Sequence, residues 1–362
     1  MRYGKQDTGE PDPRSIRGRS TRWNPGNRFE SSHVDWDPES AAAVPAERPK
    51  TEIRTEAPVR DILSKNTSPD IPFDLGLNPY RGCEHGCAYC YARPTHEYLG
   101  YSAGLDFETK IVARPEAPER LKETFARPGY QPSPLALSGV TDPYQPAEQR
   151  LRITRGCLEV LAACRHPVSL ITKNRLVLRD IDLLADLAAD QAVRVTLSIT
   201  TLDTTLARCL EPRTSSPKER LEAIAGLAAA GIPVGVNIAP LIPGLTDIEL
   251  VPILKAAAEA GALHAGYGLL RLPHAVEPLL LDWLERHEPG KRRRVLDRLR
   301  QLRNGRLSDS APGRRMKGQG IWADTYQGLF RTTAKRLGLN RYKQPLNTSA
   351  FIPPGGRQLE LL

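Results

Sequence analysis

The 362-residue chain has a composition that excludes several classes of protein. Hydrophobic residues make up 40% and charged residues 26%, as in a globular protein with a polar surface. The longest apolar runs are far shorter than the roughly 20 residues that cross a bilayer, and the first residues include no apolar signal segment. Six cysteines in so long a chain do not indicate a disulfide framework. We expect a cytoplasmic enzyme or nucleic-acid-binding protein without a membrane partner.

Positive charge is concentrated towards the C-terminal end of the chain. The net charge is +9, and residues 286–343 contain 17 basic residues against four acidic ones. Such a segment attracts phosphates, so nucleic acid is one candidate partner of residues 286–343. Within it, Arg314, Arg315 and Lys317 lie in a Gly-flanked loop suited to phosphate contact. A solvated helix surface followed by a surface loop has the same composition and is the alternative.

The predicted elements follow an N-terminal arm in chain order. Residues 1–60 are rich in Arg, Pro, Gly and acidic residues without apolar periodicity, so we predict a flexible or loosely docked arm. Short apolar runs then predict strands at 74–79, 135–140, 168–173, 193–199, 233–240 and 266–271. Amphipathic helices are predicted at 117–126, 147–164, 178–189, 218–230 and 247–260, then at 276–288, 291–305 and 321–337.

This alternation predicts an α/β fold. The strands are continuous Val/Ile/Leu runs, which is typical of parallel strands covered on both faces by helices. Six β-α units within 61–275 favour a partial (β/α)6 barrel, with a basic helical extension at 276–362. A doubly wound sheet is the alternative, although no G-x-G-x-x-G follows the first strand.

A cysteine motif stands directly after the first predicted strand, in the run RGCEHGCAYCY at 81–91. Its spacing is C-x3-C-x2-C, formed by Cys83, Cys87 and Cys90. Three thiolates on one tight loop can hold three irons of a [4Fe–4S] cluster and leave the fourth iron open. A Cys3His zinc site using His85 or His96 is an alternative, although structural zinc usually takes its ligands from two separated knuckles. Buried free thiols are the third possibility.

At these residues the chain resembles the radical S-adenosylmethionine (SAM) superfamily, whose signature is C-x3-C-x-φ-C, with Tyr89 at the aromatic position φ. Over about 70–275 it also resembles the spore photoproduct lyase-like, DNA repair photolyase-related branch. The motifs that carry this resemblance are LSGVTDPYQP at 137–146, ITKN at 171–174, LEPR at 210–213 and RLEAI at 220–224. Both ends of the chain resemble a bacterial subgroup whose substrate is not established.

The resemblance implies a radical SAM enzyme. Family members bind the amine and carboxylate of SAM at the open iron, and one electron from the cluster cleaves the S–C5′ bond. The resulting 5′-deoxyadenosyl radical abstracts a hydrogen atom from the substrate, here an unassigned molecule for which nucleic acid is one candidate. A one-electron reductant of the flavodoxin or ferredoxin type is also implied.

The resemblance and the strand-end positions together suggest a set of SAM-binding residues. Tyr89 is expected against the adenine, Lys173 near the carboxylate, and Ser198 near the ribose or carboxylate. Asp142 is expected to pair with the amine or to form an Asx turn, and Glu211 with Arg213 to form an ion pair. The full expected set is Tyr89, Ser138, Gly139, Thr141, Asp142, Lys173, Ser198, Glu211, Arg213 and Asn237, the last facing the barrel lumen.

One departure from the resemblance bears on the reaction. Spore photoproduct lyase uses a cysteine near the second-strand segment as hydrogen donor, whereas 134–146 has none, and Ser138 and Gly139 stand there instead. A hydroxyl O–H bond is too strong to replace a thiol, so we predict that the chain does not repair spore photoproduct. The alternative function is a non-catalytic nucleic-acid-binding protein stabilised by an Fe–S or zinc site.

Overall fold

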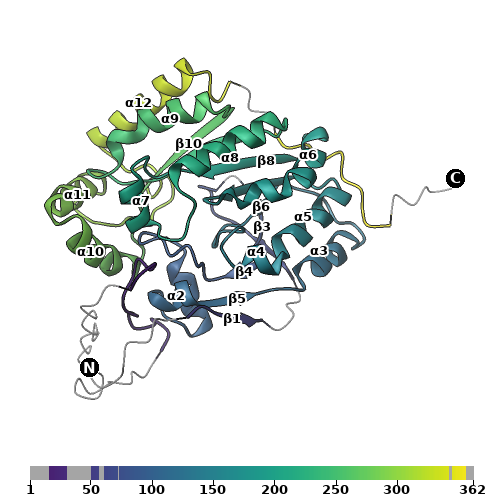
Figure 1. Ribbon diagram of the computed structural model, residues 1–362, viewed down its shortest axis with the longest axis horizontal. Coiled ribbons are helices and arrows are strands. Elements are labelled where there is room, and N and C mark those ends of the chain that lie inside the picture. Colours follow the sequence, from purple (N-terminus) through teal and green to yellow (C-terminus); the bar gives the residue numbers. More distant parts are fainter. Residues whose placement is uncertain (1–15, 31–49, 57–60, 72, 342–344, 356–362) are drawn as a thin grey trace.

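The computed structural model describes residues 16–30, 50–56, 61–71, 73–341 and 345–355, and its centre is a seven-stranded sheet (Figure 1). The strand order is β10-β9-β8-β7-β6-β3-β2. Six strands run parallel, and β2 pairs antiparallel with β3. The seven strands are β2 (Leu63–Lys65), β3 (Leu75–Leu77), β6 (Leu135–Leu137), β7 (Val168–Thr172), β8 (Val193–Ser198), β9 (Val234–Leu241) and β10 (His264–Leu269).

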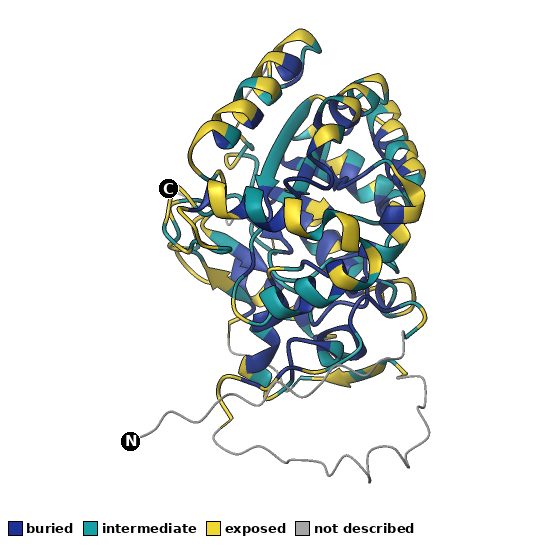
Figure 2. Ribbon diagram, turned by 90° about the vertical axis from the view of Figure 1, so that its left-hand side faces the viewer, coloured by how far each residue is buried: buried dark blue, intermediate teal, exposed yellow. Residues whose placement is uncertain are grey.

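Helices cover the parallel strands from outside, and their exposed sides face away from the sheet (Figure 2). Apolar residues in the middle of the sheet, such as Leu170, Val195 and Val236, are completely buried. Within the β-α region the helices are η1 (Arg93–Leu99), α2 (Leu105–Thr109), α3 (Ala117–Phe125), α4 (Glu148–Leu151), α5 (Ile153–Ala163), η2 (Arg175–Asp180), α6 (Ile181–Ala189), α7 (Thr204–Leu210), α8 (Pro217–Ala229), η3 (Asp247–Glu249) and α9 (Leu250–Glu259). No helix of the described segments is both long and apolar enough to cross a bilayer.

The predicted fold class is confirmed. The six parallel strands follow one another across the sheet in chain order, without the reversal that creates a switch point in a doubly wound sheet. In the described part of the chain β10 pairs with β9 alone, so the barrel is partial. The carboxyl ends of the parallel strands therefore meet at one mouth, where such folds place their chemistry.

The C-terminal extension covers the free edge of β10. It contains α10 (Val276–His287), α11 (Pro289–Leu302) and α12 (Ile321–Arg336). The Leu269 amide donates to the Met316 carbonyl at 3.1 Å, and the Asn340 side chain bonds both the amide and the carbonyl of Ala265 at 3.0 Å. These bonds occupy main-chain groups that an uncovered edge strand would leave open.

Part of the predicted flexible arm is instead packed against the domain. In a second, three-stranded sheet, β1 (Glu52–Thr55) pairs with β5 (Lys110–Ala113), which also pairs with β4 (Tyr80–Arg81). Within 16–30, Arg19, Ser20 and Thr21 are buried. Arg19 donates to the Glu108 carbonyl in α2, Thr21 to the Glu108 carboxylate, and Ser20 to the Gly86 carbonyl. The rest of the predicted arm, at 1–15, 31–49 and 57–60, lies outside the described residues. The predicted domain boundaries stay predictions.

One predicted helix, 147–164, is two helices in the structure. Arg152 has a left-handed backbone (φ 54°) between α4 and α5. The Glu148 carboxylate accepts hydrogen bonds from the amides of Thr154 at 2.9 Å and Arg155 at 3.3 Å, so it satisfies donors of the first turn of α5. This internal cap allows a new helix to begin at a point where the apolar periodicity of the sequence gives no sign of a helix boundary.

Candidate functional site

The three motif cysteines lie on the loop between β4 and η1, beside the mouth of the partial barrel. Cys83 and Cys87 are buried, Cys90 is partly buried, and all three are free thiols. Cys83 packs with Ala92 and Phe107, whereas Cys87 belongs to a separate apolar cluster. Cys90 contacts both clusters and so connects them. The three cysteines therefore lie along two neighbouring apolar clusters that Cys90 joins.

Hydrogen bonds from outside the loop fix its backbone. The Gln145 side chain accepts from the Glu84 amide at 2.9 Å and donates to the Gly82 carbonyl at 3.2 Å. The Ala88 amide donates to the Leu210 carbonyl at 3.0 Å. Gly86 has φ 61°, and a Cβ there would lie 2.6 Å from a Glu108 carboxylate oxygen, so both its conformation and its surroundings require glycine.

A buried ion pair beneath the loop was missed by the sequence analysis. Arg93 Nη2 lies 2.6 Å from Glu108 Oε1, and both side chains are completely buried. Arg93 also donates to the carbonyls of Cys87 at 3.0 Å and Gly86 at 3.2 Å. Ser20, from the N-terminal segment, bonds the same Gly86 carbonyl. Arg93 could have been suspected because it follows Cys90 by three residues, but Glu108 carries no sequence signal.

The electrostatics of the thiols suit a bound cationic centre. Burial raises the pKa of Cys83, Cys87 and Cys90 above that of a free thiol, and neighbouring negative groups raise it further at Cys83 and Cys87. Thiolates at these positions thus need a positive partner. In an iron–sulfur cluster each cysteine binds a different iron, and three buried soft donors on one loop fit that arrangement.

The zinc alternative gains little from the histidines. His85 Nδ1 lies 3.3 Å from Asp142, and its Nε2 lies 3.3 Å from the Asn174 amide nitrogen. His96 packs against the rings of Tyr101 and Phe107. Among the described residues, no three His, Cys, Asp or Glu side chains are grouped to hold a metal ion, and this applies to the three motif cysteines as well, so it does not separate zinc from an iron–sulfur cluster.

The segment after β6 lies against the cysteine loop, as the predicted site requires. Asn78 Oδ1 accepts from the Ser138 hydroxyl at 2.9 Å and from the Gly139 amide at 3.0 Å. Ser138 and Thr141 hydroxyls are 2.8 Å apart. The Tyr91 hydroxyl donates to the Gly139 carbonyl at 2.7 Å, which connects this segment to the residue after Cys90. Asn78 was not predicted, although it follows the first strand of the barrel.

Asp142 is engaged by the protein itself. Its carboxylate accepts from the Tyr144 amide at 2.9 Å, which is an Asx turn, and from the Thr172 hydroxyl at 2.7 Å and the Lys173 amide at 2.8 Å. Burial raises the Asp142 pKa, but the nearby His85 and these hydrogen bonds outweigh it, so the net shift is downward. Asp142 therefore ties the end of β6 to the end of β7.

Lys173 and Glu211 form the charged centre of the mouth. Lys173 Nζ lies 3.1 Å from Glu211 Oε1 and donates to the Thr200 hydroxyl at 3.2 Å and the Ala239 carbonyl at 3.0 Å. The Tyr89 hydroxyl also bonds Glu211, and Lys173 lies over the Tyr89 ring, 5.6 Å from its centroid. Burial opposes ionisation of Glu211, yet Arg220 and Lys173 lower its pKa overall. Tyr89 is thus held in one orientation beside Cys90.

The predicted pairing of Glu211 with Arg213 is wrong. Glu211 pairs with Arg220, whereas Arg213 Nη1 pairs with Glu84 at 3.2 Å. Arg220 extends from α8 into the protein and donates to the Ser198 carbonyl at 2.9 Å. This bond holds its guanidinium next to Glu211. The sequence analysis quoted Arg220 in a motif but gave it no role.

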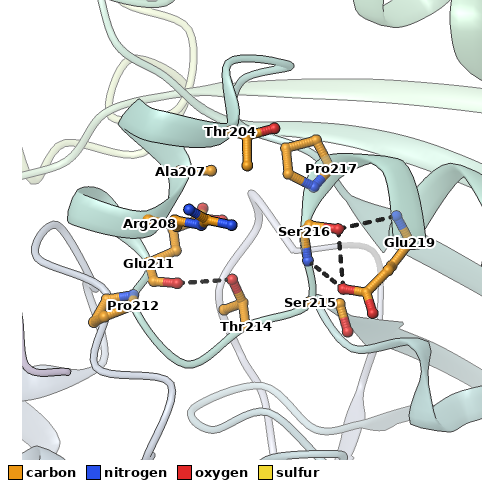
Figure 3. A pocket seen from close by; sticks show the side chains of 10 residues that line it. All are labelled: Thr204, Ala207, Arg208, Glu211, Pro212, Thr214, Ser215, Ser216, Pro217 and Glu219. Atoms are coloured by element: carbon orange, nitrogen blue, oxygen red, sulfur yellow. Dashed lines mark hydrogen bonds between the residues drawn. The ribbon is translucent and has the colours of Figure 1, made fainter.

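The remaining predicted residues lie at neighbouring strands. Ser198 ends β8 and is buried, and Asn237 lies on β9 with its amide oxygen close to Gly266 of β10. On the outer side of Glu211 there is a hollow of about 250 Å³ between α7 and the start of α8 (Figure 3). Ser216 and Glu219 form a capping box at its rim, so these polar groups serve helix α8.

Comparison with known proteins decides the family. The sequence model of the radical SAM superfamily matches residues 77–257, which include the three cysteines and, in full, the parallel strands β6, β7, β8 and β9. The chain belongs to the radical SAM superfamily. Membership of this superfamily implies SAM and an iron–sulfur cluster as cofactors.

Several known proteins are similar to this chain over a large part of its length. An uncharacterized protein of Mycobacterium tuberculosis is 38% identical over 234 residues, covering 64% of this chain and 68% of the relative. An uncharacterized protein of Methanocaldococcus jannaschii is 30% identical over 175 residues, covering 48% of this chain and 63% of that relative. Spore photoproduct lyase complexed with dinucleoside spore photoproduct has a TM-score of 0.58 at 16% identity, covering 79% of this chain and 80% of the lyase. This last likeness shows that the radical SAM fold is shared.

Proposed function

We propose that the chain is a radical SAM enzyme in which Cys83, Cys87 and Cys90 hold a [4Fe–4S] cluster. These cysteines would hold the cluster, which would supply the electron for reductive cleavage of SAM and so the radical chemistry for hydrogen abstraction from the substrate. The observation that carries the proposal is the loop itself: three free thiols with C-x3-C-x2-C spacing, two buried and one partly buried, at the mouth of a parallel β-α sheet.

The protein's own residues bind SAM and keep water away from it. Tyr89, held by Glu211, offers its ring to the adenine beside Cys90. The Gly139 carbonyl is bonded to Tyr91 beside Cys90, and the hydroxyls of Ser138 and Thr141 bond each other in the same segment, which would hold the methionyl amine. A crystal form of spore photoproduct lyase with bound AdoMet shares this fold and supports the assignment.

Anaerobic purification and analysis test the proposal. The wild-type protein should be brown, carry iron and sulfide close to four of each per chain, and release 5′-deoxyadenosine from SAM on addition of dithionite. Cys87→Ala should lose most of its iron. Cys157→Ala is the matched control, because Cys157 is an equally buried thiol on α5, outside the loop. A colourless, zinc-loaded wild-type protein would contradict the proposal and favour a non-catalytic role.

The reaction on the substrate differs from photoproduct repair in this proposal. Residues 134–146 contain no cysteine, and the Ser138 hydroxyl already bonds Asn78 and Thr141. Incubation with dinucleoside spore photoproduct, SAM and dithionite should therefore yield 5′-deoxyadenosine without thymidine products at enzymatic turnover. Turnover to thymidines would refute this part of the proposal.

A further inference from the structure

An arginine cluster lies where β10 ends beside the cysteine loop. Arg271 follows β10 by two residues, and its guanidinium lies over the Tyr91 ring, 5.3 Å from the centroid. Tyr91 directly follows Cys90 and is half-exposed. Arg271 itself is partly exposed, so a ligand at the mouth can reach it. The cluster therefore borders the place where the proposed chemistry occurs.

Two neighbouring arginines are already neutralised. Arg315 Nε lies 2.6 Å from Asp70 Oδ2, a pair that links the C-terminal extension to the loop between β2 and β3. Arg314 Nε lies 3.3 Å from Asp309 Oδ2. These arginines, which the sequence suggested as phosphate ligands, already have carboxylate partners. Their role in the described structure is to close the side of the partial barrel.

Arg271 and Arg303 lack such partners. Arg303 is 3% exposed and donates from Nη2 to the Leu270 carbonyl, while its Nε and Nη1 have no hydrogen-bond partner among the described residues. No carboxylate of the described residues forms an ion pair with either guanidinium. Burial lowers the pKa of both arginines. At Arg303 the nearby Asp309 opposes this shift and Arg271 adds to it, while at Arg271 the nearby Arg315 adds to it and Asp70 opposes it. The unpartnered N–H groups of the buried Arg303 are costly, so they favour binding of an anion beside them.

We propose that Arg271 and Arg303 bind a phosphate ester group of the substrate at the carboxyl end of β10. This inference rests on the proposed function, because it names the chemistry of the molecule that the enzyme would act on. Paired guanidinium N–H groups match phosphate oxygens in geometry and charge. Arg271 makes the contact from the open side, and Arg303 adds positive charge behind it. The phosphate then lies next to Tyr91, within the reach of the cysteine loop.

Titration calorimetry of the anaerobic holoprotein with inorganic pyrophosphate tests the site. Arg271→Met should weaken binding at least about tenfold, the loss expected for one charge-assisted contact, and Arg271→Lys should retain part of it. Arg293→Met is the matched control, because this α11 side chain is 95% exposed and its charge lies on the surface. Its affinity should stay within about twofold of the wild type. Equal affinities of wild type and Arg271→Met, or an equal loss in Arg293→Met, would overturn the proposal.

Competition experiments identify the source of the phosphate. Displacement of pyrophosphate by a nucleoside 5′-monophosphate alone assigns a terminal phosphate, and displacement by a dinucleoside monophosphate assigns the diester of a nucleic acid. Displacement by neither overturns the assignment to a phosphate ester. Cleavage of SAM without substrate is measured in parallel. Normal cleavage with no pyrophosphate binding refutes this inference alone, whereas binding without cleavage refutes the proposed function and leaves the anion site standing.

Discussion

Replacing Arg93 with methionine tests whether the cysteine loop depends on the buried ion pair beneath it. Arg93 is completely buried, with Nη2 2.6 Å from Glu108 and further N–H groups bonded to the carbonyls of Cys87 at 3.0 Å and Gly104 at 2.9 Å. Methionine fills similar volume but supplies no donor. The variant therefore leaves the Glu108 carboxylate and several loop carbonyls buried without a cation.

The expected loss of stability is large. Removing one partner of a buried ion pair costs about 3–5 kcal/mol, and each buried carbonyl left unpaired adds about 1 kcal/mol or more. We expect Arg93→Met to lower the free energy of unfolding by at least about 4 kcal/mol, against about 5–15 kcal/mol for a typical domain. Glu108→Gln keeps an acceptor for Arg93, so its loss should be smaller, at about 2 kcal/mol.

Urea denaturation under anaerobic conditions, followed by circular dichroism, measures these losses. Arg120→Met is the control, because its 2.7 Å pair with Glu123 lies on the surface of α3 and should contribute less than about 1 kcal/mol. If Arg93→Met does not fold, the free energies of unfolding of the other three proteins still test the reasoning. They should decrease in the order wild type, Arg120→Met, Glu108→Gln. The reasoning is refuted if Glu108→Gln or Arg93→Met is as stable as Arg120→Met.

Two further predictions concern buried charges. Glu211→Gln leaves the cations of Lys173 and Arg220 uncompensated and should lower the free energy of unfolding by about 3 kcal/mol. The control Glu222→Gln, on the surface of α8, should lower it by less than about 1 kcal/mol. Equal losses of the two variants in urea denaturation would contradict the charge argument. Burial lowers the pKa of His166 to about 4, below the 6.5 of a free imidazole, so its stabilisation is complete above pH 6.5 and is lost as pH falls towards 4. The free energy of unfolding should therefore drop by up to about 3 kcal/mol across that window, and an unchanged pH slope in His166→Gln would count against this origin.

The repeat of strands and helices could be predicted because it depends on local periodicity. The predicted strand at 168–173 is β7 (Val168–Thr172), and that at 193–199 is β8 (Val193–Ser198). Continuous apolar runs give strong signals because parallel strands are covered on both faces. The small sheet of β1, β4 and β5 was missed, since its strands are two to four residues long and pair across distant parts of the chain.

The candidate site likewise has features that the sequence could predict and features that it could not. The cysteines could be found because three thiols with fixed spacing on one loop form a local pattern. The ion-pair partners of the charged residues could not be found, because they depend on which side chains the fold brings close together. Glu211 meets Arg220, nine positions further along, while Arg213, only two positions away, turns to Glu84. Proximity in sequence therefore gave the wrong partner for Glu211, while the role of these groups in binding SAM stays a prediction.

The distribution of satisfied charges suggests how the mouth is shared between cofactor and substrate. Lys173 has three protein partners, and Asp142 accepts three hydrogen bonds from the protein, so neither side chain has an unmet electrostatic need. Their main effect is to fix the strand ends and Tyr89 around the cysteine loop. We infer that SAM is recognised chiefly by iron, main-chain groups and the Tyr89 ring. Arg271 and Arg303, which lack anionic partners in the described structure, then remain to recognise the substrate.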